Sequence, residues 1–253
     1  MDTLSIVTPV YNDPRLEHCL ESILAQADAP PVELIVVDGE STDETVDVID
    51  SYRDQIDTLV SEPDDGIYDA MNKGIDRATG DVVGILNADD RYNDDSVLRD
   101  VFDWLRETGA QACYGDLVYV DEDDSVVRHW ESGPYARRRM YFGWMPPHPT
   151  VFLRRELYEQ YGTFDTDLEI AADYDLILRL FLKHEIDVAY VDRVLVRMAT
   201  GGKSNESIGN IVQSNREVYR SWRRNGLRGG AIVPFCKVIR KVPQFFSGDA
   251  SLR

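Results

Sequence analysis

The stretch Ser5-Ile6-Val7-Thr8-Pro9-Val10-Tyr11-Asn12 begins as a short apolar, β-branched run and ends in a polar loop. Apolar side chains at helical spacing follow from Leu16 to Leu24, and the strand signal returns at Val32–Val37 before stopping at Asp38-Gly39. Strand, loop, helix and strand in this order open a βαβ pattern. The pattern predicts an α/β fold with a mainly parallel central sheet.

The same alternation continues along the chain. We expect further strands at Thr58–Ser61, Asp81–Leu86 and Thr150–Leu153, a hairpin of Ala112–Val120 with Val126–Trp130, and edge strands at Val188–Val191 and Val194–Met198. Helical signals span Ile67–Ala78, Asp94–Arg106, Tyr174–His184 and roughly residues 206–225. The sequence therefore predicts one domain over residues 1–200 and a helical extension over residues 201–253.

The chain is strongly acidic. Its 253 residues hold 46 Asp and Glu against 27 Lys and Arg, which gives a net charge of -19. A field of this sign repels phosphates, so we expect no nucleic-acid partner. Asp is far commoner than Lys, with 31 against 5, a bias typical of proteins from halophiles that accumulate salt. We interpret the acidity first as adaptation to such a solvent.

Cysteine use and hydropathy indicate the compartment. Cys19, Cys113 and Cys236 lie far apart and form no CxxC pair, so we expect a reduced, cytoplasmic chain. The longest apolar runs are much shorter than the roughly 20 residues of a membrane span, and the N-terminus runs directly into the first strand. The sequence predicts neither a signal peptide nor a transmembrane helix.

The extension has the opposite charge to the rest of the chain. Residues 201–253 hold 10 Lys and Arg and 3 Asp and Glu, against 17 and 43 in residues 1–200. One Trp and three Phe lie among these cations. Two interpretations stay open: a surface helix pair that touches anionic lipid at the cytosolic membrane face, or a basic tail that packs on an acidic body.

Polar residues follow three of the predicted strands. In a parallel sheet, ligands bind outside the carboxyl ends of the strands, so Thr8–Asn12, Asp38-Gly39 and Asn87–Asp90 are expected to converge on one cleft. Asp89 and Asp90 suit a hard divalent cation, which stabilises the departure of a diphosphate. Taken alone, an acidic pair after a strand is more often a turn or a helix cap.

Three blocks together resemble the family 2 glycosyltransferases: Ser5–Asn12, Glu33–Gly39 and Glu62–Gly74. Their order and spacing match over roughly residues 3–200, and the third block resembles a subgroup of bacterial and archaeal cell-surface sugar transferases. The resemblance implies the GT-A fold, a Rossmann-like sandwich. It also implies a catalytic domain with a nucleotide-binding half at about residues 1–110 and an acceptor half at about 111–200, followed by a basic amphipathic helical tail.

The resemblance implies a reaction as well. It is inverting transfer of a sugar from a UDP- or GDP-linked donor to a glycan or a polyprenyl- or dolichyl-linked acceptor, with Mn²⁺ or Mg²⁺. Asp89 is the implied metal ligand. The implied nucleotide-sugar site consists of Thr8, Pro9, Tyr11, Asp38, Asp65, Asn72, Lys73, Asn87 and Ala88. The acidic motif of the family usually starts with Asp, so Asn87 can form hydrogen bonds but brings no charge.

Inverting transfer needs one carboxylate to take the proton of the attacking hydroxyl. A glycosidase needs two because its leaving group must be protonated, whereas a metal-bound diphosphate leaves without that help. Asp173 starts a predicted helix and on position alone is an N-cap. The acidic motif of the family lies at the same place, which implies that Asp173 is the base, with Asp175 in reserve.

Two further groups are candidates for binding. His148 lies between Pro147 and Pro149 in a long loop, and both His148 and Asp175 are candidates for contact with the acceptor or the metal. The run Arg137–Arg139 binds phosphate in one interpretation and is a solvated basic face in the other.

Other protein classes fit the sequence less well. A sugar-1-phosphate nucleotidyltransferase typically has a Gly-rich, basic loop after its first strand, but residues 9–14 contain no glycine. A dinucleotide-dependent oxidoreductase has a GxGxxG segment there, which this chain lacks. A scaffold that binds sugar nucleotides without catalysis also remains open, and Asn87 is the feature that favours it.

Overall fold

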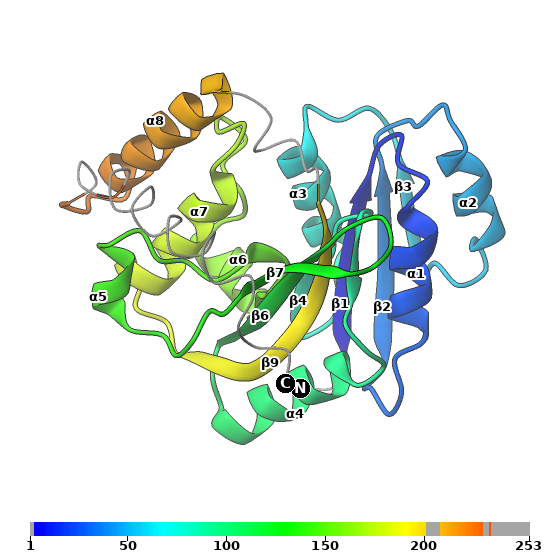
Figure 1. The fold of residues 1–253 in the computed structure, drawn as a ribbon, viewed down its shortest axis with the longest axis horizontal. Helices are drawn as coiled ribbons and strands as arrows, with labels where there is room; N and C mark the ends of the chain where they lie inside the picture. The colour runs from blue at the N-terminus through cyan, green and yellow to red at the C-terminus, as the bar shows by residue number, and fades with distance from the viewer. Residues whose placement is uncertain (1–2, 201–207, 230–232, 234–253) are drawn as a thin grey trace.

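A nine-stranded sheet forms the middle layer of the protein in the part that the computed structural model describes, which is residues 3–200, 208–229 and Val233 (Figure 1). The strands follow the order β3-β2-β1-β4-β8-β6-β9-β5, and β7 pairs with β6. Their bounds are β1 Leu4–Val10, β2 Val32–Asp38, β3 Thr58–Ser61, β4 Val82–Ile85, β5 Asp90–Tyr92, β6 Ala112–Val120, β7 Val126–Trp130, β8 Phe152–Arg154 and β9 Val188–Ala199.

Helices cover both faces of this sheet. Their bounds are α1 Leu16–Leu24, α2 Thr45–Ser51, α3 Ile67–Arg77, α4 Val97–Thr108, α5 Arg137–Met140, α6 Arg155–Tyr161, α7 Ala172–Ile177 and α8 Ile208–Arg224. A 3-10 turn at His148–Thr150 precedes β8, and π-helical turns at Leu178–Lys183 continue α7. The α/β fold predicted from the alternation of strands and helices is confirmed.

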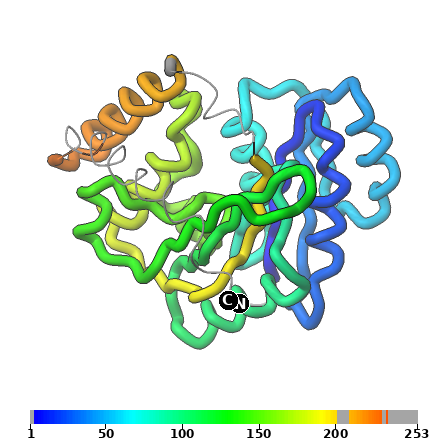
Figure 2. Tube along the Cα trace, in the orientation of Figure 1, coloured from blue at the N-terminus to red at the C-terminus, as the bar shows by residue number. Residues whose placement is uncertain are grey.

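The first four strands in space form the parallel half of the sheet. Strand β1 pairs in parallel with β2 and β4, and β2 pairs in parallel with β3. Beyond β4 the sheet is mixed: β8 is antiparallel to β4 and β6, whereas β9 is parallel to β6. Figure 2 shows the two halves as a blue and cyan part and a green to orange part of the trace.

Alternation along β1 explains the two hydrophobic cores. Leu4 and Ile6 point to the side covered by α1, α2 and α4, whereas Val7 points to the side of α3, and all three side chains are fully buried. The core on the α3 side continues through α6 and α7 to Val218 and Trp222 of α8. The sheet is therefore buried on both faces, as expected for parallel strands.

Two details of the sheet differ from the sequence-based expectation. Residues Val188–Ala199 form one strand, β9, that lies between β6 and β5, so the prediction of two edge strands is wrong. The register with β6 shifts near Asp116, opposite the gap between the two predicted strands. The acidic segment after β4 turns into β5, because Asp90–Tyr92 pairs with residues 196–198 of β9.

The basic helix α8 packs on the acidic body. Trp222 of α8 is fully buried, and its Nε1 donates a hydrogen bond of 2.8 Å to the Tyr174 hydroxyl. Arg224 pairs with Asp165 and Asp167 on the loop before α7. This part of the extension follows the packing interpretation. The predicted second half of the tail lies outside the described residues, apart from Val233, and none of the described helices is both long and apolar enough to span a membrane.

Gly74 brings α3 close to the sheet, and its replacement by Ala is expected to destabilise the fold. A Cβ at Gly74 would overlap Val7 Cγ1 and lie 3.2 Å from Val37 Cγ2. Helix propensity alone would stabilise Gly74→Ala by about 1 kcal/mol, but overpacking costs about 1–3 kcal/mol, so we expect a lower free energy of unfolding in urea. The exposed Gly209 of α8 is the matched control, and Gly209→Ala should leave stability unchanged or slightly higher. A Gly74→Ala protein more stable than the parent would contradict this packing.

Candidate functional site

The ends of three parallel strands lie in one row. Val10 of β1 pairs with Asp38 of β2, and Asp38 pairs with Ser61 of β3. The loops that follow these strands are tied together, because the Asn12 N–H donates to Ser41 Oγ at 2.9 Å and Asn12 Oδ1 accepts from the Thr42 N–H at 2.8 Å. Asn12 adopts a left-handed backbone conformation with φ 48°. The first two predicted segments therefore converge.

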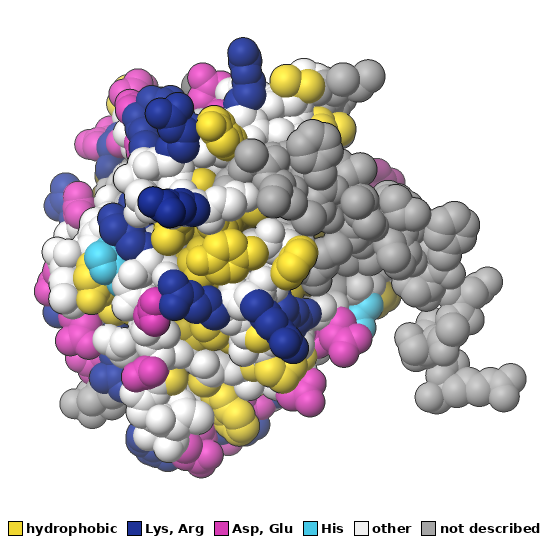
Figure 3. Space-filling view, turned by 90° about the vertical axis from the view of Figure 1, so that its left-hand side faces the viewer, with side chains coloured by type: hydrophobic (Ala, Val, Ile, Leu, Met, Phe, Trp, Pro, Cys, Tyr) yellow, Lys and Arg dark blue, Asp and Glu magenta, His cyan; other side chains and the backbone are white. Residues whose placement is uncertain are grey.

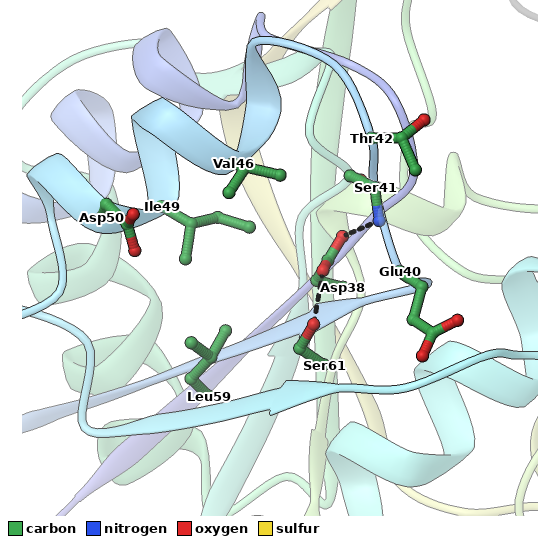
Figure 4. Close-up of a pocket in the computed structure, with 9 residues that line it drawn as sticks. All are labelled: Asp38, Glu40, Ser41, Thr42, Val46, Ile49, Asp50, Leu59 and Ser61. Carbon is green, nitrogen blue, oxygen red and sulfur yellow. Dashed lines mark hydrogen bonds between the residues drawn. The ribbon is translucent and has the colours of Figure 1, made fainter.

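Asp38 lies at the wall of a cavity of about 400 Å³ (Figure 4). Its side chain is 3% exposed and its carboxylate is held on both oxygens. Oδ1 accepts from the Ser41 N–H at 3.0 Å, and Oδ2 accepts from Ser61 Oγ at 2.7 Å. The lining residues are Asp38, Glu40, Ser41, Thr42, Val46, Ile49, Asp50, Leu59 and Ser61. A planar polar ligand that reaches this wall meets a carboxylate whose position is fixed.

Of the residues expected from β1, only Tyr11 is exposed. The Tyr11 side chain is 57% exposed and lies next to Gly39, where an added Cβ would be 3.3 Å from the ring. Thr8 is fully buried, with its Oγ1 3.9 Å from Cys19 Sγ of α1, and Pro9 is buried within the strand. Thr8 and Pro9 therefore shape the strand end, while Tyr11 offers a ring face to a ligand.

The segment after β4 forms an acidic centre. Asp89 is half-buried, and its Oδ2 lies 3.6 Å from the Arg15 guanidinium at the start of α1. Asp90 is 1% exposed, and its Oδ2 accepts from Asn87 Nδ2 at 3.1 Å. The Asn87 and Asp90 Oδ1 atoms are buried without a hydrogen-bond partner. Ala88 is buried in the core between them.

Burial makes these carboxylates costly as anions. It raises the pKa of Asp89, although the Arg15 charge opposes the rise. Burial and the Asp89 charge raise the pKa of Asp90 well above its usual range. A bound cation would offset both effects, and oxygen ligands are the ones that Mn²⁺ and Mg²⁺ prefer.

The acidic centre fits a divalent cation that takes only some of its ligands from the protein. The unpartnered oxygens of Asn87 and Asp90 and the carboxylate of Asp89 supply hard donors on one side. No cluster of three or more His, Cys, Asp or Glu side chains that could hold a metal occurs among the described residues. A cation here would therefore take its remaining ligands from water and from substrate oxygens, as Mg²⁺ commonly does.

Three more of the expected residues lie in the loop before α3, at Asp65, and within α3 itself, at Asn72 and Lys73. Lys73 Nζ donates to the Pro63 carbonyl at 2.7 Å and lies 3.1 Å from Glu62 and 3.2 Å from Asp69. Burial would lower the pKa of Lys73, but the hydrogen bonds with these two carboxylates raise it, so the ammonium stays charged. Asp65 is exposed, and its N–H donates to Asp69 Oδ2 at 3.2 Å.

Asn72 contacts backbone in the structure. Its Nδ2 donates to the Phe164 carbonyl at 3.0 Å, and its Oδ1 accepts from the Phe164 N–H at 2.9 Å. Both ends of the amide are therefore used to join α3 to the loop before α7. The predicted contact of Asn72 with ribose or diphosphate is not tested by this arrangement.

A second cluster surrounds Asp173 in the first turn of α7. The Tyr68 hydroxyl of α3 donates to the Ile170 carbonyl at 2.9 Å and to Asp173 Oδ1 at 3.4 Å. The rings of Tyr68 and His148 both contact Phe164, at centroid distances of 5.5 and 5.4 Å. Burial lowers the pKa of His148, and the Asp173 charge opposes this. His148 and Asp173, which are far apart in the sequence, are thus brought together.

Asp175 lies in a different environment from Asp173. It is 2% exposed, and its oxygens accept from Arg179 at 3.0 Å and from Asn225, directly after α8, at 3.0 Å. Burial raises the pKa of Asp175, and the Arg179 charge opposes the rise. These contacts fasten α7 to α8 and leave no free carboxylate oxygen toward the Asp173 cluster.

The family model for Glycosyl transferase family 2 matches residues 5–162 of this chain. The chain belongs to this family. It is 32% identical over 206 residues to a PGL/p-HBAD biosynthesis glycosyltransferase of Mycobacterium bovis, an alignment that covers 79% of this chain and 78% of the relative. The protein is therefore a glycosyltransferase.

Solved structures support the fold. S. aureus TarS in complex with UDP-GlcNAc superposes with a TM-score of 0.67 at 19% identity, over 89% of this chain and 65% of that chain. The mannosyltransferase PcManGT of Pyrobaculum calidifontis, in complex with GDP-Man and Mn²⁺, gives 0.59 at 21% identity, over 94% and 64%. At such identities these likenesses show the GT-A fold of the glycosyltransferase, as the sequence predicted.

Sequence reasoning missed two side chains of this candidate site. Tyr68 belongs to the block Glu62–Gly74 that carried the family resemblance, so its position was a signal that the prediction did not use. Arg15 gave no such signal, because a single arginine after a loop is common on protein surfaces. Its contact with Asp89 depends on how α1 lies against the end of β4.

Replacing Asn72 tests whether this side chain braces the fold or binds the donor. Asn72→Ala leaves the N–H and carbonyl of Phe164 without their partner, and we expect a loss of about 1–3 kcal/mol in the free energy of unfolding in urea. Asn72→Asp keeps the acceptor for the Phe164 N–H but sets a carboxylate oxygen against the Phe164 carbonyl, so it should also be destabilised. Unchanged stability together with weaker donor binding would show that the amide acts in the donor site instead.

Proposed function

We propose that this glycosyltransferase moves a sugar from a nucleoside-diphosphate donor to a hydroxyl acceptor with inversion, using a divalent cation and Asp173 as the base. The observation that carries the proposal is that α3 links two sites with carboxylates: the strand ends around Asp38 and the segment at Asp173. Asp64, in the loop before α3, lies against Gly39 at the end of β2, and Tyr68 in the first turn of α3 reaches Asp173. One helix thus connects the donor edge with the base.

The donor would lie across the carboxyl ends of β1, β2 and β4. Asp38 and Tyr11 are positioned for the nucleoside, with Thr8 and Pro9 behind them in β1. UDP-GlcNAc and GDP-Man in the complexes of TarS and PcManGT support a UDP- or GDP-linked donor. Lys73 and the polar segment at Asp65 are proposed to approach the diphosphate or ribose once Lys73 leaves its carboxylate partners.

Asp89 is the proposed metal ligand, with Asn87 and Asp90 beside it. When bound, Mn²⁺ or Mg²⁺ neutralises the charge that develops on the departing diphosphate. The Mn²⁺ in the PcManGT complex supports the choice of ion. The uncharged Asn87 keeps an oxygen without a hydrogen-bond partner, so we expect it to serve as a neutral ligand or as a hydrogen-bond acceptor for a coordinated water.

The transfer itself needs one proton acceptor. An acceptor hydroxyl oxygen attacks the anomeric carbon, its proton passes to the Asp173 carboxylate, and the bond between the anomeric carbon and the diphosphate oxygen breaks. The electron pair of that bond leaves with the nucleoside diphosphate. Tyr68 and His148 are proposed to orient Asp173 and the acceptor. Burial and the Asp173 charge raise the pKa of Tyr68, so its hydroxyl stays a donor.

The outer face of α8 supports a lipid-linked acceptor at the cytosolic face of a membrane. Ile211, Val212 and Tyr219 are 50%, 53% and 43% exposed, and the exposed Arg216 and Arg220 lie on the same face. Figure 3 shows Lys and Arg side chains around hydrophobic ones on this side of the molecule. Apolar side chains flanked by arginines suit an anionic lipid surface, although the rest of the chain is acidic.

Removing either proposed carboxylate should abolish most turnover. We expect Asp173→Asn to lower kcat by about 10²–10⁴-fold without loss of donor binding, since a general base contributes that much. Asp89→Ala should remove the dependence of turnover on Mn²⁺ or Mg²⁺. Turnover is measured as the release of nucleoside diphosphate from a panel of donors. Asp76→Asn on the exposed face of α3 is the matched control and should match the parent.

Three results would overturn the proposal. Parent-like turnover in both variants would remove the base and the metal ligand. Donor binding without any turnover in the parent would favour a sugar-nucleotide-binding scaffold. Formation of pyrophosphate from a nucleoside triphosphate and a sugar 1-phosphate would favour a nucleotidyltransferase.

The lipid interaction is tested with vesicles. Ile211→Glu combined with Val212→Glu should weaken binding to vesicles that contain phosphatidylglycerol by at least about tenfold, because it removes buried apolar area and adds like charge. Val126 and Val127 of β7 are 48% and 49% exposed, and the same double change there should have no effect on binding. Equal losses, or none, in a sedimentation assay would reject α8 as the lipid-binding face.

A further inference from the structure

Helix α8 places a buried carboxylate against the segment that leads into Asp173. Glu217 is 8% exposed, and its oxygens accept three backbone hydrogen bonds. Oε1 accepts from the Glu169 N–H at 3.3 Å, while Oε2 accepts from the N–H groups of Ile170 and Ala171, both at 2.9 Å. The contacts join residues 46 to 48 positions apart, so chain proximity does not explain them.

The chemistry of both partners favours this contact. N–H groups at and before a helix start have no partner within the helix, and α7 has no side-chain cap of its own at Ala171. A buried carboxylate is costly unless it is hydrogen-bonded. Gln213 completes the arrangement, because its Nε2 donates to Glu217 Oε1 at 3.1 Å and to Glu169 Oε2 at 2.7 Å. Glu217 thus holds backbone that would otherwise lack acceptors.

The same backbone is held from its other side by α3. Tyr68 donates to the Ile170 carbonyl and to Asp173 Oδ1, so the N–H of Ile170 is bound by Glu217 and its carbonyl by Tyr68. Asp173 follows three residues later, in the first turn of α7, and its Oδ1 also accepts from the Tyr174 N–H at 2.7 Å. The position of the Asp173 carboxylate therefore depends on a segment clamped between α3 and α8.

We propose that Glu217 is a positioning residue for Asp173, which makes α8 a part of the catalytic apparatus. This inference rests on the proposed function of Asp173 as the base. In its proposed role, Glu217 contacts neither donor nor acceptor. It fixes where the carboxylate stands relative to the acceptor hydroxyl, and a displacement of about 1 Å at such a position can cost on the order of 10²-fold in rate.

Other contacts fasten α8 without Glu217. Trp222 donates to the Tyr174 hydroxyl at 2.8 Å, and Asn225 donates to Asp175 at 3.0 Å. Val218 is fully buried in the core beside Glu217. Because these contacts remain, Glu217→Gln is expected to fold. It weakens the contact with the backbone, since only one oxygen of the amide can accept where two oxygens accepted before.

The test compares Glu217→Gln with Val218→Ala, a neighbour whose loss weakens packing but leaves the three hydrogen bonds in place. Steady-state kinetics of the full chain with donor, acceptor and Mn²⁺ should show kcat about 10- to 100-fold lower in Glu217→Gln, with the donor KM within twofold of the parent. Val218→Ala should keep the kcat of the parent despite a lower melting temperature. Hydrogen exchange should speed up at the Ile170 and Ala171 amides in Glu217→Gln only.

Glu217→Asp serves if the amide variant does not fold. It keeps the charge and shortens the side chain by one methylene, and a smaller fall in kcat is expected, with faster exchange at the same amides. Parent-like kcat in a folded Glu217 variant whose amides exchange faster would overturn the inference. An equal loss of kcat in Val218→Ala would also overturn it, because the effect would then be general packing.

Asp173→Asn measured in parallel separates this inference from the proposed function. If Asp173→Asn lowers kcat by about 10²–10⁴-fold and Glu217→Gln adds no further loss to the turnover that remains, the two residues act as one unit and the inference stands. If Asp173→Asn retains the turnover of the parent, the base assignment fails and the inference falls with it. If only Glu217→Gln is parent-like, the base stands and the inference alone is wrong.

Discussion

Parallel pairing of β1 with β2 and β4 places the ends of these strands at one edge of the sheet, and the geometry of the candidate site at that edge depends on this register. The pairing sets Val10, Asp38 and Ser61 in one row and lets the segment at Asn87 emerge beside them. A shift of one residue in β1 would exchange the faces of Ile6 and Val7, which pack in opposite cores. Burial on both faces therefore fixes the geometry of the site.

Electrostatics shapes what that edge can hold. The chain keeps buried carboxylates in two ways: Asp38 and Asp175 have hydrogen-bond donors on both oxygens, whereas Asp90 keeps one oxygen without a partner. The first arrangement stabilises a structure, and the second leaves capacity for a cation. Asp89 lies at the boundary between buried and solvent-facing carboxylates, next to Arg15. In this acidic protein, the contrast separates carboxylates that stabilise the fold from carboxylates with an oxygen that can bind a ligand.

Local patterns predicted the parts of the fold that are local in sequence. The hairpin of Ala112–Val120 with Val126–Trp130 matches its predicted bounds, because strand alternation and an acidic turn are read within a few residues. The pairing of Asp90–Tyr92 with β9 was missed, since it joins segments about a hundred residues apart. The site shows the same division: Asp38 and Asp89 follow from strand ends, whereas the contacts of Tyr68 and Glu217 exist only in the folded chain.

We propose that the acidic centre at Asp89 binds a nucleotide sugar together with a divalent cation. A thermal-shift screen of UDP- and GDP-sugars, with and without Mn²⁺ or Mg²⁺, measures this directly, because a ligand at 100 times its Kd stabilises the folded state by about 2.7 kcal/mol. We expect at least one nucleotide sugar to raise the melting temperature only when the cation is present, and Asp89→Ala to lose this rise. A metal-independent rise, or an equal rise in Asp89→Ala, would contradict it.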